Sequence, residues 1–136
     1  MQRYSRDAMH RFVDHTSELE LELEAESAEG VLAEALDAFV ELAGSGTGEI
    51  VERELALEAS DLPALLATWL DELLYLADSE ALLPESAELT VFETRLEGRV
   101  RLRRGEPRPL VKAVTLHRLR LRPENGVWRG RVVLDV

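Results

Sequence analysis

Apolar and polar residues alternate without interruption over Leu19–Glu26, where leucine or alanine fills the odd positions and glutamate the even ones. A period of two is typical of a strand with one buried and one exposed face. The polar segment Asp14–Glu18 comes directly before this run, so we expect it at the entrance to the strand. Its side chains can equally form local turn hydrogen bonds. Residues 51–59 repeat the alternation and predict a second strand.

Two other segments have the spacing of helices. Apolar residues recur every three or four positions over residues 31–43, after Ser27, which is a good N-cap. Glycines at 44–48 end this helix. Residues 62–74 carry a broader apolar stripe after Asp61 as cap, which predicts the central helix of the core.

The last third of the chain reads as antiparallel strands. We predict a turn at Glu97-Gly98, a long strand over Leu110–Arg122, and a hairpin at Asn125-Gly126 before a final strand. His117 falls on the inward parity of the long strand, which favours a hydrogen-bonded core imidazole over a ligand. Helices and strands do not alternate regularly, so the predicted class is α+β, a largely antiparallel β-sheet packed with two α-helices. Residues 1–136 are expected to form one domain.

Composition narrows the function classes. The chain is 46% hydrophobic, which indicates a folded core, and it has no cysteine, which excludes disulfides, zinc thiolates and a thiol nucleophile. No run approaches the ~20 apolar residues of a membrane span. The first residues also lack the apolar core of a signal peptide. We therefore expect a cytoplasmic protein without a membrane role.

The net charge of −11 argues against a general nucleic-acid binder, but the charge is unevenly distributed. Residues 1–94 hold 23 acidic and 4 basic residues, whereas residues 95–136 hold 4 acidic and 12 basic ones. Mutual neutralisation across strands is the favoured interpretation, because few aromatic residues accompany the arginines for base stacking. The arginines concerned are Arg99, Arg101, Arg118, Arg120 and Arg122.

Carboxylates are the remaining candidates for chemistry, since no nucleophilic triad is evident. Asp14 and Glu18 share strand parity, and Asp135 lies one residue from the terminal carboxylate of Val136. These groups would converge if the first and last strands were neighbours. Several oxygen ligands around a small cavity suit a hard cation, Ca²⁺ or Mg²⁺.

Four blocks in the chain resemble the archease family, in the family's order and spacing. They are Phe12–Glu18, Trp69–Leu76, Val111–His117 and Val132–Val136. In the first block the family usually has Asp-His-Thr-Ala-Asp. Archeases are small accessory proteins of the RtcB-type RNA ligase. They speed formation of its guanylylated histidine, permit multiple turnovers in tRNA splicing and RNA repair, and bind a divalent cation.

The resemblance implies an archease-like fold, no catalysis by the chain alone, and contact with RNA only through the ligase. It implies metal ligands at Asp14, Asp135 and Val136, and at Glu18, which is one methylene longer than the family's usual aspartate. It implies roles in partner contact or activation for His15, Glu72, Lys112 and His117.

Two functions of other classes stay open. The first is a small metal-dependent hydrolase using Asp14, His15 and Asp135. The second is an RNA-binding module using the arginine-rich C-terminal strands. Intrinsic turnover would favour the hydrolase, and salt-sensitive RNA binding without the ligase would favour the RNA-binding module.

Overall fold

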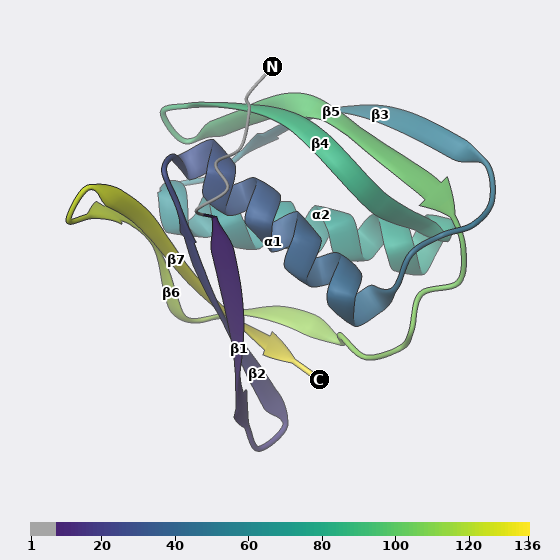
Figure 1. Cartoon of the computed structure of the whole chain (residues 1–136), viewed down its shortest axis with the longest axis horizontal. Coiled ribbons are helices and arrows are strands. Elements are labelled where there is room, and N and C mark those ends of the chain that lie inside the picture. Colours follow the sequence, from purple (N-terminus) through teal and green to yellow (C-terminus); the bar gives the residue numbers. More distant parts are fainter. Residues whose placement is uncertain (1–7) are drawn as a thin grey trace.

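Two helices lie between two antiparallel sheets in the computed structural model, which describes residues 8–136 (Figure 1). The elements are β1 (Met9–His15), β2 (Glu18–Ala25), α1 (Ala28–Ala43), β3 (Ile50–Glu58), α2 (Leu62–Glu80), β4 (Leu82–Phe92), β5 (Arg95–Arg104), β6 (Ala113–Glu124) and β7 (Val127–Asp135). One sheet has the order β1-β2-β7-β6 and the other β3-β5-β4. The α+β class is confirmed, with the strands divided between two sheets. Neither helix is long and apolar enough to cross a membrane, and no other helix is described in residues 8–136.

Both helices begin where local sequence signals predict, and α1 ends at the predicted glycines, whereas α2 continues beyond the predicted residues 62–74 to Glu80. The Ser27 hydroxyl accepts a hydrogen bond from the Gly30 N–H at 3.0 Å, and the Asp61 carboxylate accepts one from the Ala64 N–H at 2.8 Å. Each cap satisfies a backbone donor that has no partner within the helix. Gly44 ends α1 with φ 98°, a conformation that glycine adopts without steric cost.

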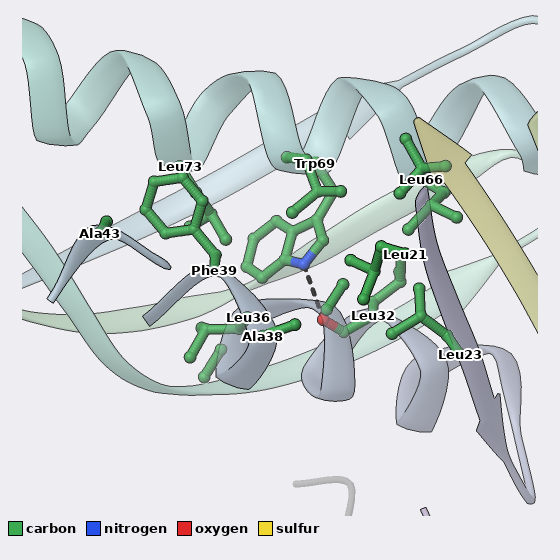
Figure 2. Close-up of a cluster of buried hydrophobic side chains, with 14 of the residues drawn as sticks. Leu21, Leu23, Leu32, Leu36, Ala38, Phe39, Ala43, Leu66, Trp69 and Leu73 are labelled. Carbon is green, nitrogen blue, oxygen red and sulfur yellow. Dashed lines mark hydrogen bonds between the residues drawn. The ribbon is translucent and has the colours of Figure 1, made fainter. Parts of the chain in front are cut away.

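The core forms where α2 packs against α1. Trp69 is fully buried, and its indole Nε1–H donates to the Leu32 carbonyl of α1 at 2.8 Å (Figure 2). Leucines 65, 66, 70 and 73 of α2 are buried around it. The prediction that α2 is the central helix of the core is therefore confirmed.

The predicted turn at Glu97-Gly98 is wrong. Phe92 of β4 pairs with Arg95 of β5, so the connection lies at residues 93–94 and Gly98 is inside β5. A Cβ at position 98 would lie 2.2 Å from the Glu88 carbonyl oxygen of β4. The glycine therefore allows a close approach between strands and does not make a turn.

The predicted long strand also needs correction. β6 begins at Ala113, and its pairing with β7 shifts between Thr115 and Arg120. Residues 116–119, here called the β6 bulge, thus oppose the single residue Val132 of β7. Because the bulge interrupts the alternation of inward and outward side chains, His117 is exposed and is not the core imidazole that strand parity predicted. The hairpin that joins β6 to β7 at Asn125-Gly126 is confirmed.

Candidate functional site

The polar segment Asp14–Glu18 forms a hairpin end and not a single strand. Asp14 and His15 end β1, Thr16 and Ser17 make the turn, and Glu18 begins β2. Ser17 has φ 63°, in the left-handed region. The shared parity inferred for Asp14 and Glu18 is therefore wrong, because the two residues belong to different strands.

The C-terminus lies beside this hairpin. Glu18 of β2 pairs directly with Asp135 of β7, which confirms that the first alternating strand and the last strand are neighbours. The Val136 N–H donates to the Ser17 carbonyl at 3.2 Å, and the Lys112 N–H donates to the Asp135 carbonyl at 2.8 Å. Asp14, Glu18, Asp135 and the terminal carboxylate of Val136 thus gather at one end of the four-stranded sheet, here called the carboxylate corner.

The strand register decides on which face of the sheet each side chain lies. Asp14 pairs with Leu19, a core residue, so the Asp14 side chain lies on the face of the sheet that packs on the helices. Glu18 opposes both His15 and Asp135, and these three side chains start from the outer face. Val136 directly follows the end of β7. The acidic groups therefore lie at one end of the sheet, with Asp14 on one face and Glu18 and Asp135 on the other.

The chemistry of the corner suits a hard cation, but its side chains have not closed around one position. All four acidic groups offer oxygen donors, which Ca²⁺ and Mg²⁺ prefer. Within residues 8–136 no three side chains of His, Asp or Glu form a group that could hold a metal ion. The strand pairing therefore brings these acidic residues to one end of the sheet without bringing their side chains onto one position.

The other predicted residues divide into two groups. His15, Lys112 and His117 are exposed at or near the corner. Glu72 lies elsewhere, on α2, facing β3 of the other sheet. There the pKa of Arg53 is raised, chiefly by its hydrogen bond to Glu80, and the charge of Glu72 is a smaller cause.

Glu20 was missed by the sequence analysis. Alternation predicts an exposed glutamate, but Glu20 is only 6% exposed on the outer face of the four-stranded sheet. Its Oε1 lies 2.8 Å from Nη2 of Arg118 in the β6 bulge and 3.5 Å from Nε2 of His15. The available signal was the run Val132-Val133-Leu134, because consecutive apolar residues indicate a strand covered on both faces.

A histidine cluster joins β1 to α1. His10 Nδ1 lies 2.5 Å from Glu34 Oε2, and its Nε2 lies 3.0 Å from Glu41 Oε1. Burial lowers the pKa of His10, but the bonds and charges of the two glutamates outweigh it and raise the pKa above its ordinary value. The pKa of neighbouring Asp37 is raised, first by burial and then by the charge of Glu34.

Several of the strand arginines pair with glutamates on other strands, as the charge asymmetry predicted, whereas Arg120 and Arg122 pair with Glu124 of their own strand, β6. The pairs between strands include Arg99–Glu54 at 3.2 Å, Arg103–Glu85 at 3.0 Å and Arg129–Glu24 at 2.8 Å. An open hollow of about 600 Å³ lies around Gly98 on the outer face of the three-stranded sheet. None of the predicted site residues lines it.

Comparisons with known proteins agree with the motif blocks. The sequence profile of the archease protein family matches residues 10–136. The chain is 31% identical to the archease of Archaeoglobus fulgidus, over 93% of this chain and 98% of the relative, and 30% identical to that of Methanopyrus kandleri, over 91% and 96%. Its structure is similar to the solution structure of protein 1598 of Methanobacterium thermoautotrophicum, with a TM-score of 0.71 and 28% identity over 93% of this chain and 98% of that one. An archease of Thermotoga maritima, described as a possible chaperone, has the same fold, with a TM-score of 0.61 and 24% identity over 91% and 94%.

Proposed function

The chain belongs to the archease family, and from this premise we propose that it is an accessory activator of an RtcB-type RNA ligase. In this role it promotes guanylylation of the ligase and allows multiple turnovers, in the cytoplasm, during tRNA splicing or RNA repair. It catalyses no reaction alone and meets RNA only through the ligase. The observation that carries the proposal is the family match over residues 10–136, which includes the carboxylate corner.

The corner is the part of the molecule best suited to act on the ligase. It gathers Asp14, Glu18, Asp135 and the terminal carboxylate of Val136 at an accessible end of the sheet. Complementary charge steers two proteins together and fixes their orientation. An acidic corner is therefore suited to a ligase surface that is rich in basic groups and metal.

Asp14, Glu18, Asp135 and the terminal carboxylate would hold a divalent cation, Ca²⁺ or Mg²⁺, as hard oxygen ligands. The cation would neutralise phosphate charge on the nucleotide. The contribution of the chain is to keep the donors in register. The hydrogen bonds of Val136 with Ser17 and of Lys112 with Asp135 hold the C-terminal strand in place from two sides. His15, Lys112 and His117 are exposed near these donors and would contact the ligase, whereas Glu72 would act at a separate surface on α2.

The RNA-binding alternative gains no support from the arginines, since they pair with glutamates, either on other strands or, for Arg120 and Arg122, on their own strand. The hydrolase alternative would need Asp14 and Asp135 to act together with His15. The register places the Asp14 and Asp135 side chains on opposite faces of the sheet, and this holds equally for the proposed cation site, so turnover by the protein alone is what separates the two functions.

A ligase guanylylation assay tests the proposal. Purified RtcB-type ligase is incubated with GTP and divalent metal, with and without this protein, and covalent guanylylation and joined RNA are measured over time. We expect faster guanylylation and multiple turnovers when the protein is present. Asp14→Ala and Asp135→Ala should abolish the effect with unchanged thermal unfolding, because both side chains lie at the rim of the fold.

The matched control is Glu88→Ala, which removes an exposed carboxylate from the other sheet and should activate like the wild type. If the wild-type protein leaves the ligase at a single turnover, the proposal is wrong. Hydrolytic turnover by the protein alone would support the hydrolase instead. Submicromolar RNA binding at about 0.15 M salt, where charges are screened beyond roughly 8 Å, would support the RNA-binding module.

A further inference from the structure

The β6 bulge is an irregular feature in an otherwise regular sheet. Four residues of β6, Leu116–Leu119, oppose one residue of β7, and Arg118 within the bulge has φ 53°. A non-glycine residue in this region is strained and persists only when surrounding contacts hold it. Bulges of this kind are common beside functional sites, where they redirect side chains.

Two contacts of Arg118 hold the bulge in place. Its guanidinium Nη2 lies 2.8 Å from Glu20 Oε1 of β2, and its carbonyl accepts a hydrogen bond from Arg131 Nε of β7 at 2.9 Å. The bulge is thus fixed over the outer face of the sheet, where Glu20 is 6% exposed and Val133 is fully buried. This ion pair and this hydrogen bond, together with the hydrogen bond that the His117 N–H donates to Thr115 Oγ1 at 3.2 Å, hold the bulge in its position.

Stability alone does not account for a carboxylate at position 20. Among the residues that the structure describes, no donor makes a hydrogen bond of good geometry to Glu20 Oε1, so its contact with Arg118 is an ion pair only. Such a buried pair is often no more stabilising than apolar residues of similar volume. Its specific effect is to fix one position of the bulge.

The bulge presents an apolar side chain beside the carboxylate corner. Leu116 is 74% exposed, more than any other large hydrophobic residue of the described chain. Three positions before it, Ala113 pairs with Asp135, and Glu18 and Glu20 share the outer face of β2. Leu116 is therefore an exposed apolar side chain near the carboxylate corner, and charged side chains of both signs surround it in the sheet, among them Lys112, Arg118 and Asp135, as polar groups surround the centre of protein interfaces.

We propose that the β6 bulge is the docking element of this protein. Leu116 enters an apolar pocket on the partner ligase, and basic groups around that pocket pair with Glu18 and Asp135. Glu20 and Arg118 are positioning residues that keep Leu116 at the height and angle the pocket requires. This inference rests on the proposed function and names the surface through which it operates.

The first test replaces the knob. Leu116→Ser should weaken binding to the purified ligase about tenfold, because an exposed leucine that becomes buried contributes roughly the free energy of one decade in affinity. Thermal unfolding should not change, and the guanylylation rate at saturating protein should match the wild type, since the corner is intact. Phe92→Ser is the matched control, as Phe92 is 67% exposed on the other sheet. It should bind like the wild type.

The second test separates positioning from mere structural support. Arg118→Ala should weaken binding by a similar factor, because the bulge loses its ion pair with Glu20. The double variant Arg118→Ala with Leu116→Ser should then bind little worse than either single variant. Two independent effects would instead multiply, which would contradict the positioning role.

Calorimetric binding and guanylylation are measured separately, so the two proposals can fail separately. If the wild type activates the ligase and Leu116→Ser binds as tightly, the docking inference is wrong and the proposed function stands. If the wild type binds without activating, the proposed function is wrong, and a loss of affinity in Leu116→Ser still supports docking. If the wild type neither binds nor activates, both are wrong.

Discussion

Substitutions of the two partners of the Glu20–Arg118 ion pair should change the free energy of unfolding in opposite directions. Glu20→Leu replaces a buried carboxylate that lies opposite Val13 on one side and Val133 on the other, both on its own face of the sheet. Arg118→Ala instead removes the cation and leaves the carboxylate buried. The Arg118 side chain is 43% exposed, so it can return to water when Glu20 is replaced, whereas Glu20, at 7%, cannot when Arg118 is removed.

The magnitudes follow from this asymmetry in exposure. Exchanging a buried ion pair for apolar residues ranges from neutral to stabilising, and we expect about 1 kcal/mol of stabilisation for Glu20→Leu, the low end, because Arg118 keeps its charge. Removing one partner of a buried ion pair leaves an uncompensated charge and costs roughly 3–5 kcal/mol, and we expect about 3 kcal/mol for Arg118→Ala, the low end, because the pair is reached by water on the Arg118 side. In a domain of this size 1 kcal/mol corresponds to about 3 °C in Tm.

Urea unfolding followed by tryptophan fluorescence measures both free energies, because Trp69 is fully buried in the core. The control is Arg99→Ala, which breaks an exposed pair with Glu54 and should change stability by less than about 0.5 kcal/mol. A Glu20→Leu variant clearly less stable than the wild type would refute the argument that burial of this carboxylate is costly. An Arg118→Ala variant as stable as the wild type would show that Glu20 is not held by Arg118.

Two further predictions concern the ends of the same sheet. Glu34 and Glu41 raise the folded-state pKa of His10 above its ordinary value. The protonated His10 therefore stabilises the fold fully below about pH 6.5, and this contribution is lost as the pH rises through the folded pKa. His10→Gln should flatten the pH dependence of the unfolding free energy above about pH 6.5, and an unchanged slope would contradict this. Extending the chain beyond Val136 converts the terminal carboxylate to an amide and should abolish Ca²⁺ binding and ligase activation without lowering Tm; a C-terminally tagged protein that binds Ca²⁺ and activates as well as the untagged one would exclude the terminal carboxylate as a ligand.

The helices were predictable because their signals are local. Ser27 and Asp61 cap their helices through residues three positions away, and the apolar spacing that follows lies within one element. Gly98 and the β6 bulge were not predictable, because their reasons lie on other strands. The absence of a side chain at position 98 is explained by the Glu88 carbonyl of β4.

The candidate site was predictable in part for the same reason. The convergence of Glu18 with Asp135 was predicted only if the first and last strands were neighbours, and the pairing of β2 with β7 meets that condition. The parity of Asp14 was misjudged because the turn at Thr16-Ser17 has no glycine or asparagine to announce it, although Ser17 takes a positive φ. The burial of Glu20 depends on Arg118, which is 98 positions away in the sequence, and no local pattern encodes that contact.

The carboxylate corner and the docking element depend on the same strand pairing. Glu18 and Glu20 lie two residues apart on the outer face of β2; the first pairs with Asp135 at the corner, and the second is held under Arg118 of the bulge. β7 lies between β2 and β6, so its register fixes the distance between the acidic donors and Leu116. A one-residue slip of β7 would reverse the faces of Val133 and Asp135 together. One set of backbone hydrogen bonds thus fixes the position of the carboxylate corner relative to the β6 bulge. The hydrogen bonds of Val136 with Ser17 and of Lys112 with Asp135 extend that register to the last residue of the chain.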